Sequence, residues 1–453
     1  MVKEAAAWSA RLCLLFAVAA CGSSAAEQRY DGMLVELARQ RPAAASGDGR
    51  DLFAGDASLD RTRLVEAVLA RSPDIEAARQ AWRAALAEVP AARSLEDPML
   101  TYELAPLSVA GDAPFGQRVE LSQKLPWPGK RRLAGEVAVA EAEAMKGELD
   151  SVRLELALMA SNLYDDLVLV GRSIEVNQQH QQLLAELKKA AEAQYVAGRA
   201  SQQDPLQAEV ELGELERDRI MLDAEKDAVV AELNGLLRRD PAAALPAPPA
   251  EDPPAAVASV DSGALADEAL ATRPELRAQA ARTRGARAAI DAADRDFYPD
   301  LELMGSYDSM WDMPEHRWMV GVGIEIPLQR GRRRAAVDKA EAMTARARSE
   351  EDRLRSGIRA EVERAAVRAR EAARLVRLIE ERLLPAARDQ VKAASAGFVT
   401  GKNEFVTVIA AENNLRKVEL ELHHARTDLS RRMAALDRAV GRIPGLAHDG
   451  GVR

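Results

Sequence analysis

Few residues of this 453-residue chain have side chains whose type and spacing could support a reaction. The only two cysteines, Cys13 and Cys21, cannot form a disulfide framework or an all-cysteine zinc site. Gly321-Val322-Gly323 lacks the third glycine of a dinucleotide-binding fingerprint, and Gly129-Lys130 precedes arginine where a phosphate-binding loop has serine or threonine. The five histidines are scattered, so the sequence predicts no enzyme, no cofactor and no metal centre.

One cysteine lies where its thiol could be modified. A positively charged start precedes an apolar run at 12–20, which is too short to span a bilayer as a helix but suits the core of a signal peptide. The run ends in Val18-Ala19-Ala20-Cys21, which resembles the lipobox of bacterial lipoproteins, in which the cysteine becomes acylated after cleavage. We therefore expect a lipid on Cys21; an ordinary signal peptide cut at another small residue is the alternative. Gly22 in place of aspartate favours sorting to the outer membrane.

The composition favours long helices over a compact globule. Charged residues make up 30% of the chain and aromatic residues only 4%. The formal net charge of −10, with both signs interspersed, offers no basic surface for nucleic acid. Arginine and glutamate interrupt every long helical stretch after the signal peptide, so we expect any membrane crossing to use β-strands.

The chain contains an internal repeat whose anchor residues keep their order along both copies. The matched pairs are Pro73 and Pro274 at an offset of 201, Pro126 and Pro327 at 201, Gly129 and Gly331 at 202, and Gly198 and Gly401 at 203. Ordered matches with so little drift indicate a duplicated unit. The expected divisions are a signal peptide at 1–20, a flexible segment at 21–58, repeats at 59–240 and 264–442, a proline-rich linker at 241–263 and a tail at 443–453.

Each repeat is expected to contain a helix, a strand pair, a very long helix, a tight turn and a second long helix. The first helix is predicted at 64–93, the strands at 99–109, 117–126, 300–310 and 317–327, and the very long helix of the first repeat at 130–196. Apolar residues spaced three and four apart along the long helices indicate coiled-coil packing. Gly198 and Gly401 lie between long helices, where a residue with positive φ can end one helix and begin the turn.

The predicted strands alternate between apolar residues and charged or small ones, which is typical of a sheet with one apolar and one wet face. A half-buried soluble hairpin alternates in the same way. Aromatic residues gather at the strand ends, which favours a membrane interface. The polar faces would line a water-filled lumen through Arg118, Glu120, Lys124, Glu302, Asp308 and Glu325. Four strands cannot close a barrel, so membrane strands would require several copies of the chain.

Residues 60–440 resemble the TolC family of outer-membrane efflux channels. The resemblance lies in the duplicated helix–strand hairpin–helix–helix units, the two glycine turns and the stretch Ser122-Gln123-Lys124-Leu125-Pro126-Trp127-Pro128-Gly129-Lys130, which is similar to the cation-efflux (CzcC/CusC-like) branch. The resemblance implies a mainly α chain with a β-barrel portion. Three copies would form a 12-stranded β-barrel that continues as a coiled-coil α-barrel in the periplasm.

The resemblance also implies partners and a gate. The turns at Gly198 and Gly401 would contact a periplasmic adaptor protein, which links to an inner-membrane RND-type pump. The family has acidic residues six and nine positions after the second turn glycine, where this chain has Thr407 and Ala410. Other acidic side chains that could line the mouth are Asp204, Glu404 and Glu412.

The leading hypothesis is therefore a homotrimeric, passive duct in outer-membrane lipid, which exports small solutes and, by the resemblance, heavy-metal cations. The competing hypothesis is a structural periplasmic lipoprotein, a coiled-coil scaffold whose strand hairpins lie in water and form no pore.

Overall fold

The computed structural model describes residues 25–39, 52–53, 55, 57–106, 115–249, 261–311 and 313–446. They form two compact units that do not coincide with the two repeats, because each unit takes segments from both. Unit 1 contains 79–147 and 278–351, and unit 2 contains 148–277 and 352–446, each with part of the N-terminal region. Cys21 and the signal peptide lie outside the described residues.

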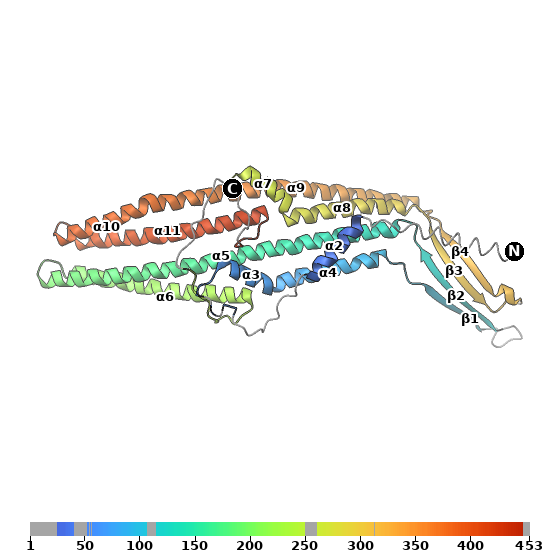
Figure 1. Cartoon of the computed structure of the whole chain (residues 1–453), viewed down its shortest axis with the longest axis horizontal. Helices are drawn as coiled ribbons and strands as arrows, with labels where there is room; N and C mark the ends of the chain where they lie inside the picture. The colour runs from blue at the N-terminus through green and yellow to red at the C-terminus, as the bar shows by residue number, and fades with distance from the viewer. Residues whose placement is uncertain are drawn as a thin grey trace. The chain divides into compact units, whose positions relative to one another are not determined.

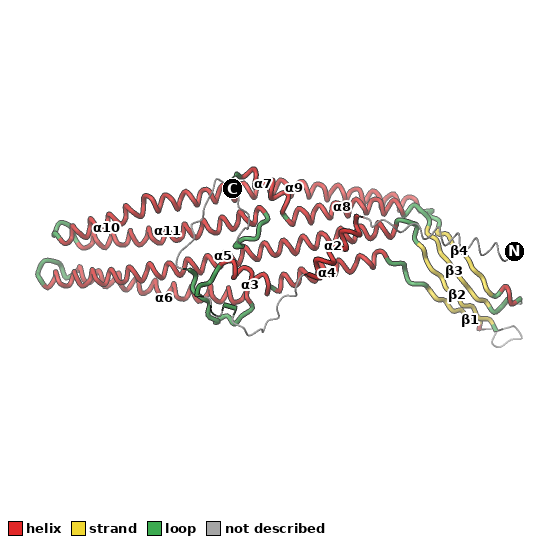
Figure 2. The backbone as a smooth tube through the Cα atoms, viewed as in Figure 1, coloured by secondary structure: helices red, strands yellow, loops and turns green. Residues whose placement is uncertain are grey.

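Unit 1 is built around a four-stranded antiparallel sheet in the order β1-β2-β3-β4 (Figures 1 and 2). The strands are β1 (Met99–Ala105), β2 (Gly116–Leu125), β3 (Asp300–Asp308) and β4 (Trp318–Glu325). All four predicted strands are confirmed: β1, β3 and β4 are shorter than the sequence pattern indicated, and β2 is shifted by one residue. The central pair joins the repeats, with Leu121 of β2 opposite Gly305 of β3.

Unit 2 consists of two helical hairpins and the short helices that pack on them (Figure 1). The first hairpin is formed by α5 (Lys130–Val196), whose first turns belong to unit 1, and α6 (Gln203–Leu237). The second is formed by α10 (Leu384–Val399) and α11 (Phe405–Val440). A core near the two turns draws apolar residues from all four helices, including Ala191, Ala208, Phe398 and Phe405.

The long helix predicted at 130–196 is confirmed by α5, which has the same bounds. Apolar residues are buried along two stripes of α5, with Leu156 and Val170 on one and Leu154 and Tyr164 on the other. Burial along two stripes indicates that α5 packs against neighbours on more than one side. Among the described residues, no helix combines the length and apolar character needed to cross a membrane.

The single helix predicted at 64–93 is wrong, because two helices occupy it: α3 (Arg61–Arg71) and α4 (Pro73–Arg93). Proline disfavours helical backbone in the residue before it, and Ser72 accordingly has φ −62° and ψ 128°. Proline then begins the next helix, where its missing N–H has no intrahelical partner to lose. The same break recurs in the second repeat between α7 (Ser262–Thr272) and α8 (Pro274–Arg295).

The long helix of the second repeat differs from its counterpart by a π-helical turn. Helix α9 (Arg330–Leu378) is followed by this turn at Ile379–Leu383 and then by α10. The spacing from Gly331 to Gly401 is one residue longer than that from Gly129 to Gly198. A π-helical turn holds one extra residue without ending the helix, so it accounts for the increase of the repeat offset from 202 to 203.

Several described residues outside the two repeats make contacts with the repeats. Residues 21–58, expected to be flexible, contain helix α2 (Ala25–Arg39), which buries Met33 and pairs Glu36 with Lys146. In the predicted linker, the Leu59 N–H donates to the Ala247 carbonyl at 2.9 Å. At the start of the tail, the Thr62 hydroxyl donates to the Gly445 carbonyl at 3.0 Å. These residues therefore pack on the units that they flank.

Candidate functional site

The sheet of unit 1 has one continuous apolar face. Strand pairing places the apolar residues of all four strands in register, for example Tyr102 beside Val119, Val119 beside Tyr307, and Tyr307 beside Trp318. The exposed fractions of these side chains are high for an apolar surface, reaching 74% for Trp318 and 91% for Val320. A contiguous apolar surface of this kind indicates a membrane or a partner rather than water.

The opposite face of the sheet carries the six residues predicted to line a lumen. The register places Arg118 opposite Asp308, Lys124 opposite Glu302, and Glu325 opposite Asp300, and Glu120 lies two residues from Arg118 on the same strand. Arg118 pairs with Glu120 at 2.6 Å and Lys124 with Glu325 at 3.1 Å. The structure therefore brings all six side chains to one charged face, and their role in lining a pore stays a prediction.

Glycines on the charged face give space to a neighbouring side chain. A Cβ on Gly321 would lie 2.9 Å from Met304 Cγ, and one on Gly323 would lie 3.3 Å from Met304 Cε. Met304 therefore lies over these two glycines, which explains why β4 alternates apolar residues with glycine.

An aromatic pair marks the end of the sheet where β2 leads toward α5. The rings of Trp127 and Tyr298 stack with centroids 5.5 Å apart and planes 16° from parallel. The backbone N–H of Trp127 donates to the Asp300 carboxylate at 2.8 Å, which also pairs with Lys130 at 2.8 Å. The Pro-Trp-Pro-Gly-Lys stretch thus links the two strand pairs, because Tyr298 and Asp300 belong to the second repeat.

The two hairpin turns of unit 2 have the same backbone geometry. Gly198 has φ +68° and Gly401 has φ +70°, values that favour glycine over all other residues. Arg199 N–H donates to the Gln194 carbonyl and Lys402 N–H to the Gly397 carbonyl, both at 2.8 Å. This pattern satisfies the last carbonyls of each helix, so both glycines act as C-terminal caps.

A groove of roughly 760 Å³ is lined by residues of both hairpin turns, including Arg199, Gly401, Phe405 and two of the predicted gate residues. Asp204 lies in the first turn of α6, and Glu404 precedes α11. Thr407 and Ala410 are exposed on α11. Two acidic side chains thus lie at the hairpin ends, while a gating role stays a prediction.

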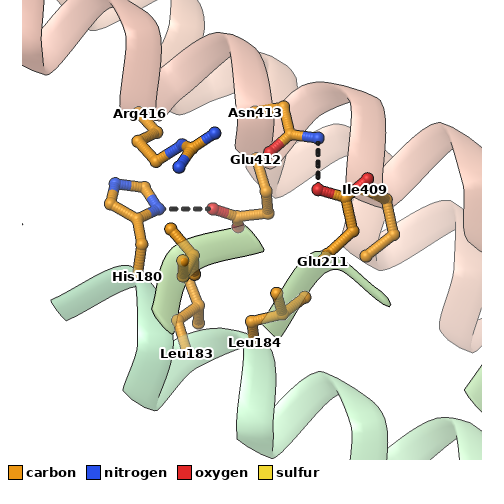
Figure 3. A pocket seen from close by; sticks show the side chains of 9 residues that line it. His180, Leu183, Leu184, Glu211, Ile409, Glu412, Asn413 and Arg416 are labelled. Atoms are coloured by element: carbon orange, nitrogen blue, oxygen red, sulfur yellow. Dashed lines mark hydrogen bonds and ion pairs between the residues drawn. The ribbon is translucent and has the colours of Figure 1, made fainter. Parts of the chain in front are cut away.

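Glu412, the third predicted gate residue, does not lie at the hairpin ends. It is only 7% exposed and lines a small, partly open cavity of about 10 Å³ together with His180, Glu211 and Arg416 (Figure 3). Its expected position at the mouth is therefore wrong, because position 412 falls on the side of α11 that packs against α5. The sequence interpretation passed over His180, whose acidic neighbours are more than 230 residues away along the chain.

The pKa values of Glu412 and Glu419, the two acidic neighbours of His180, are shifted in opposite directions. Removal from water raises the pKa of Glu412, with the negative charge of Glu419 adding to the effect. A hydrogen bond with His180 lowers the pKa of Glu419. Within the described parts of the chain, no group of three or more His, Cys, Asp or Glu side chains could hold a metal ion.

Comparison with known proteins agrees with this architecture. Residues 265–442 match the family model described as outer membrane efflux protein. No curated protein matches the chain.

Solved structures similar to this chain cover most of its length. The outer-membrane channel OprN is 19% identical, covering 89% of this chain and 98% of its own with a TM-score of 0.70. CusC, whose structures concern transmembrane channel formation, is 18% identical over the same shares with a TM-score of 0.71. The outer membrane protein VceC from Vibrio cholerae is 19% identical, covering 84% of this chain and 96% of its own with a TM-score of 0.69. The predicted TolC-type fold is confirmed.

Proposed function

From the match of residues 265–442 to the outer membrane efflux protein family model, we propose that the protein is the channel subunit of a tripartite, RND-type efflux system. The channel is a passive duct through which small solutes leave the periplasm for the exterior. The observation that carries the proposal is the two-faced sheet, with an exposed apolar face and a charged face.

The four-stranded sheet of one chain has open edges, so it cannot lie in a membrane alone. In lipid, unpaired strand edges are too costly, because no water satisfies their N–H and C=O groups. Within the sheet, β1 and β4 each pair with one neighbour, so each leaves an edge for another copy. Three copies supply twelve strands and close the barrel, with the apolar face toward lipid and the charged face toward the lumen.

The charges of the lumen face favour cations. In each chain the register places six carboxylates there (Glu103, Glu120, Asp300, Glu302, Asp308 and Glu325) and two cationic side chains (Arg118 and Lys124). An excess of carboxylates in a narrow channel raises the local concentration of cations. This supports cations, among them heavy-metal ions, as cargo. A cation-selective reversal potential in a salt gradient across a planar bilayer is expected, and anion selectivity would contradict this cargo.

The helical hairpins would contact the partner proteins of the duct. Their turns end in exposed loops with a shared groove, a suitable contact for a periplasmic adaptor that links to the pump. Asp204 and Glu404 at these ends would form the acidic part of the gate. The lipid on Cys21 would add an anchor, but a single acyl chain binds membranes weakly, so the barrel dominates attachment.

Two adjacent substitutions on β4 test the proposal. Val320 pairs with Gly305 on the apolar face, and Met319 pairs with Ser306 on the charged face. Val320→Arg is expected to destabilise the barrel by about 2–4 kcal/mol if it lies near the bilayer midplane. Met319→Arg places the same charge toward water, so a cost below about 1 kcal/mol is expected.

The measurement is folding into lipid vesicles over a urea series, with single-channel conductance recorded for each folded protein. Equal tolerance of both substitutions together with no conductance by the native protein would contradict the duct. That result would favour the alternative, a periplasmic coiled-coil scaffold whose sheet lies in water.

A further inference from the structure

His180 is a buried titratable group between the two helical hairpins. It lies on α5 of the first hairpin and is 7% exposed. Its Nε2 atom is 3.0 Å from an Oε atom of Glu419, and its Nδ1 atom is 3.7 Å from an Oε atom of Glu412. Both carboxylates belong to α11 of the second hairpin. One imidazole ring therefore faces two carboxylates across the contact between hairpins, and Figure 3 shows the ring beside Glu412.

The number of N–H groups on the ring decides whether one or both carboxylates can receive a hydrogen bond. A neutral imidazole has one N–H and can donate to one carboxylate only, whereas the protonated ring donates from both nitrogens. In the present arrangement the Glu419 contact is a hydrogen bond, and the Glu412 contact is too long for one. That Glu412 oxygen is buried and has no hydrogen-bond partner among the described residues. A buried carboxylate without a partner is costly, and a proton relieves that cost.

Other charged groups face the cluster from each neighbouring helix. Glu211 of α6 accepts a hydrogen bond from the Asn413 amide at 3.1 Å. Arg416 of α11 lines the same cavity and pairs with Asp218 of α6 at 3.2 Å. Arg388 of α10 pairs with Glu419 at 3.4 Å. Four carboxylates thus face two guanidinium groups, and the negative excess falls when a proton binds.

We propose that His180, Glu412 and Glu419 form a proton-sensitive latch between the two helical hairpins, which tightens as pH falls below neutral and loosens as pH rises. The latch itself requires only the geometry of unit 2. Its effect on the open end of the duct rests on the proposed function.

The direction follows from the two carboxyl groups. The pKa of Glu412 is raised in the closed arrangement, so closing is favoured below that pKa and the advantage is lost as pH rises through it. The pKa of Glu419 is lowered, so its contribution is present above the ordinary carboxyl pKa of about 4.3 and is lost as pH falls through the lowered value. The latch is therefore tightest in mildly acidic solution. Each proton taken up on closing changes the closed-to-open ratio by at most about tenfold per pH unit.

Hydrogen–deuterium exchange of the full-length protein, read by mass spectrometry at 176–186 and 408–422, tests the latch. Each variant is compared with the native chain at the same pH, so the intrinsic effect of pH on exchange cancels. Glu412→Gln removes the buried charge and keeps the shape, so we expect several-fold slower exchange than the native chain at pH 8 and equal exchange at pH 5.5. His180→Gln keeps an amide donor but cannot take a proton, so we expect faster exchange than the native chain at pH 5.5.

His424→Gln is the matched control, because His424 lies on α11 but is exposed, and we expect native exchange at both pH values. The latch is refuted if Glu412→Gln exchanges like the native chain at pH 8, or if His424→Gln reproduces the effect of His180→Gln. Conductance at pH 5.5 and 8 separates the two proposals. A protein that conducts but lacks the exchange effect refutes the latch alone, and one that shows the exchange effect without conducting supports the latch and refutes the duct.

Discussion

The hairpin turns offer a quantitative test of how the backbone ends these helices. Gly401 has φ +70°, and a Cβ added there would meet no atom within 4 Å. Gly401→Ala therefore introduces no steric clash. Its cost is the conformational penalty of about 1–2 kcal/mol for an L-residue in the left-handed region. The reduced freedom of the unfolded chain returns about 0.4–1 kcal/mol. The net destabilisation of the turn is about 1 kcal/mol, which corresponds to roughly fivefold more frequent local opening.

Hydrogen exchange of the backbone amides at 392–406 measures this opening directly, because these amides exchange when the turn opens. Gly198→Ala in the first hairpin has φ +68° and the same open surroundings, so the same change is expected at 190–204. Gly171→Ala is the control: this glycine lies inside α5 with ordinary φ and no atom within 4 Å, so alanine stabilises the helix by up to about 1 kcal/mol. Unchanged or slower exchange in Gly401→Ala would refute the cap assignment.

Three further predictions concern the hairpin core, the linker and the lipid. Phe405→Ala removes a 1% exposed ring that packs on Phe398 with centroids 5.3 Å apart, so we expect the free energy of unfolding in urea to fall by about 3–5 kcal/mol. The neighbouring Val406 is 47% exposed, so Val406→Ala is expected to change that free energy by less than about 1 kcal/mol. Asn234→Ala deletes a buried amide that donates to two linker carbonyls at 3.1 and 2.7 Å, so we expect about 1–3 kcal/mol lower stability and faster exchange at 241–249. Cys21→Ala is expected to abolish incorporation of labelled fatty acid while the barrel stays in the membrane fraction; incorporation at native levels would refute acylation at this position.

Much of the fold could be predicted from local sequence patterns. Alternation along 117–126 and 317–327 set the strand faces, and the register of β2 and β3 then brought residues such as Lys124 and Glu302 together. The uninterrupted apolar spacing from Lys130 to Val196 gave the bounds of α5. These features depend on neighbours within a few residues, which a sequence displays directly.

Other features depend on contacts between distant segments or on the backbone conformation of single residues. Pro73 is an anchor of the repeat, and the same residue splits the helix predicted at 64–93. Glu412 was assigned by its distance from Gly401 along the chain, but the rotation of α11 turns it toward His180. No local pattern identifies such a pair, because hairpin packing alone brings α5 and α11 together.

The π-helical turn at Ile379–Leu383 makes the two halves of the duplicated chain unequal. One residue advances an α-helix by about 100°, so an extra residue would rotate every later side chain away from its partner if the helix were regular throughout. The bulge absorbs that rotation at a single point, and Ile379, its first residue, is fully buried. The duplicated halves have therefore diverged in length without losing their common packing, and a chimera that exchanges the two long helices would have to carry this bulge with it.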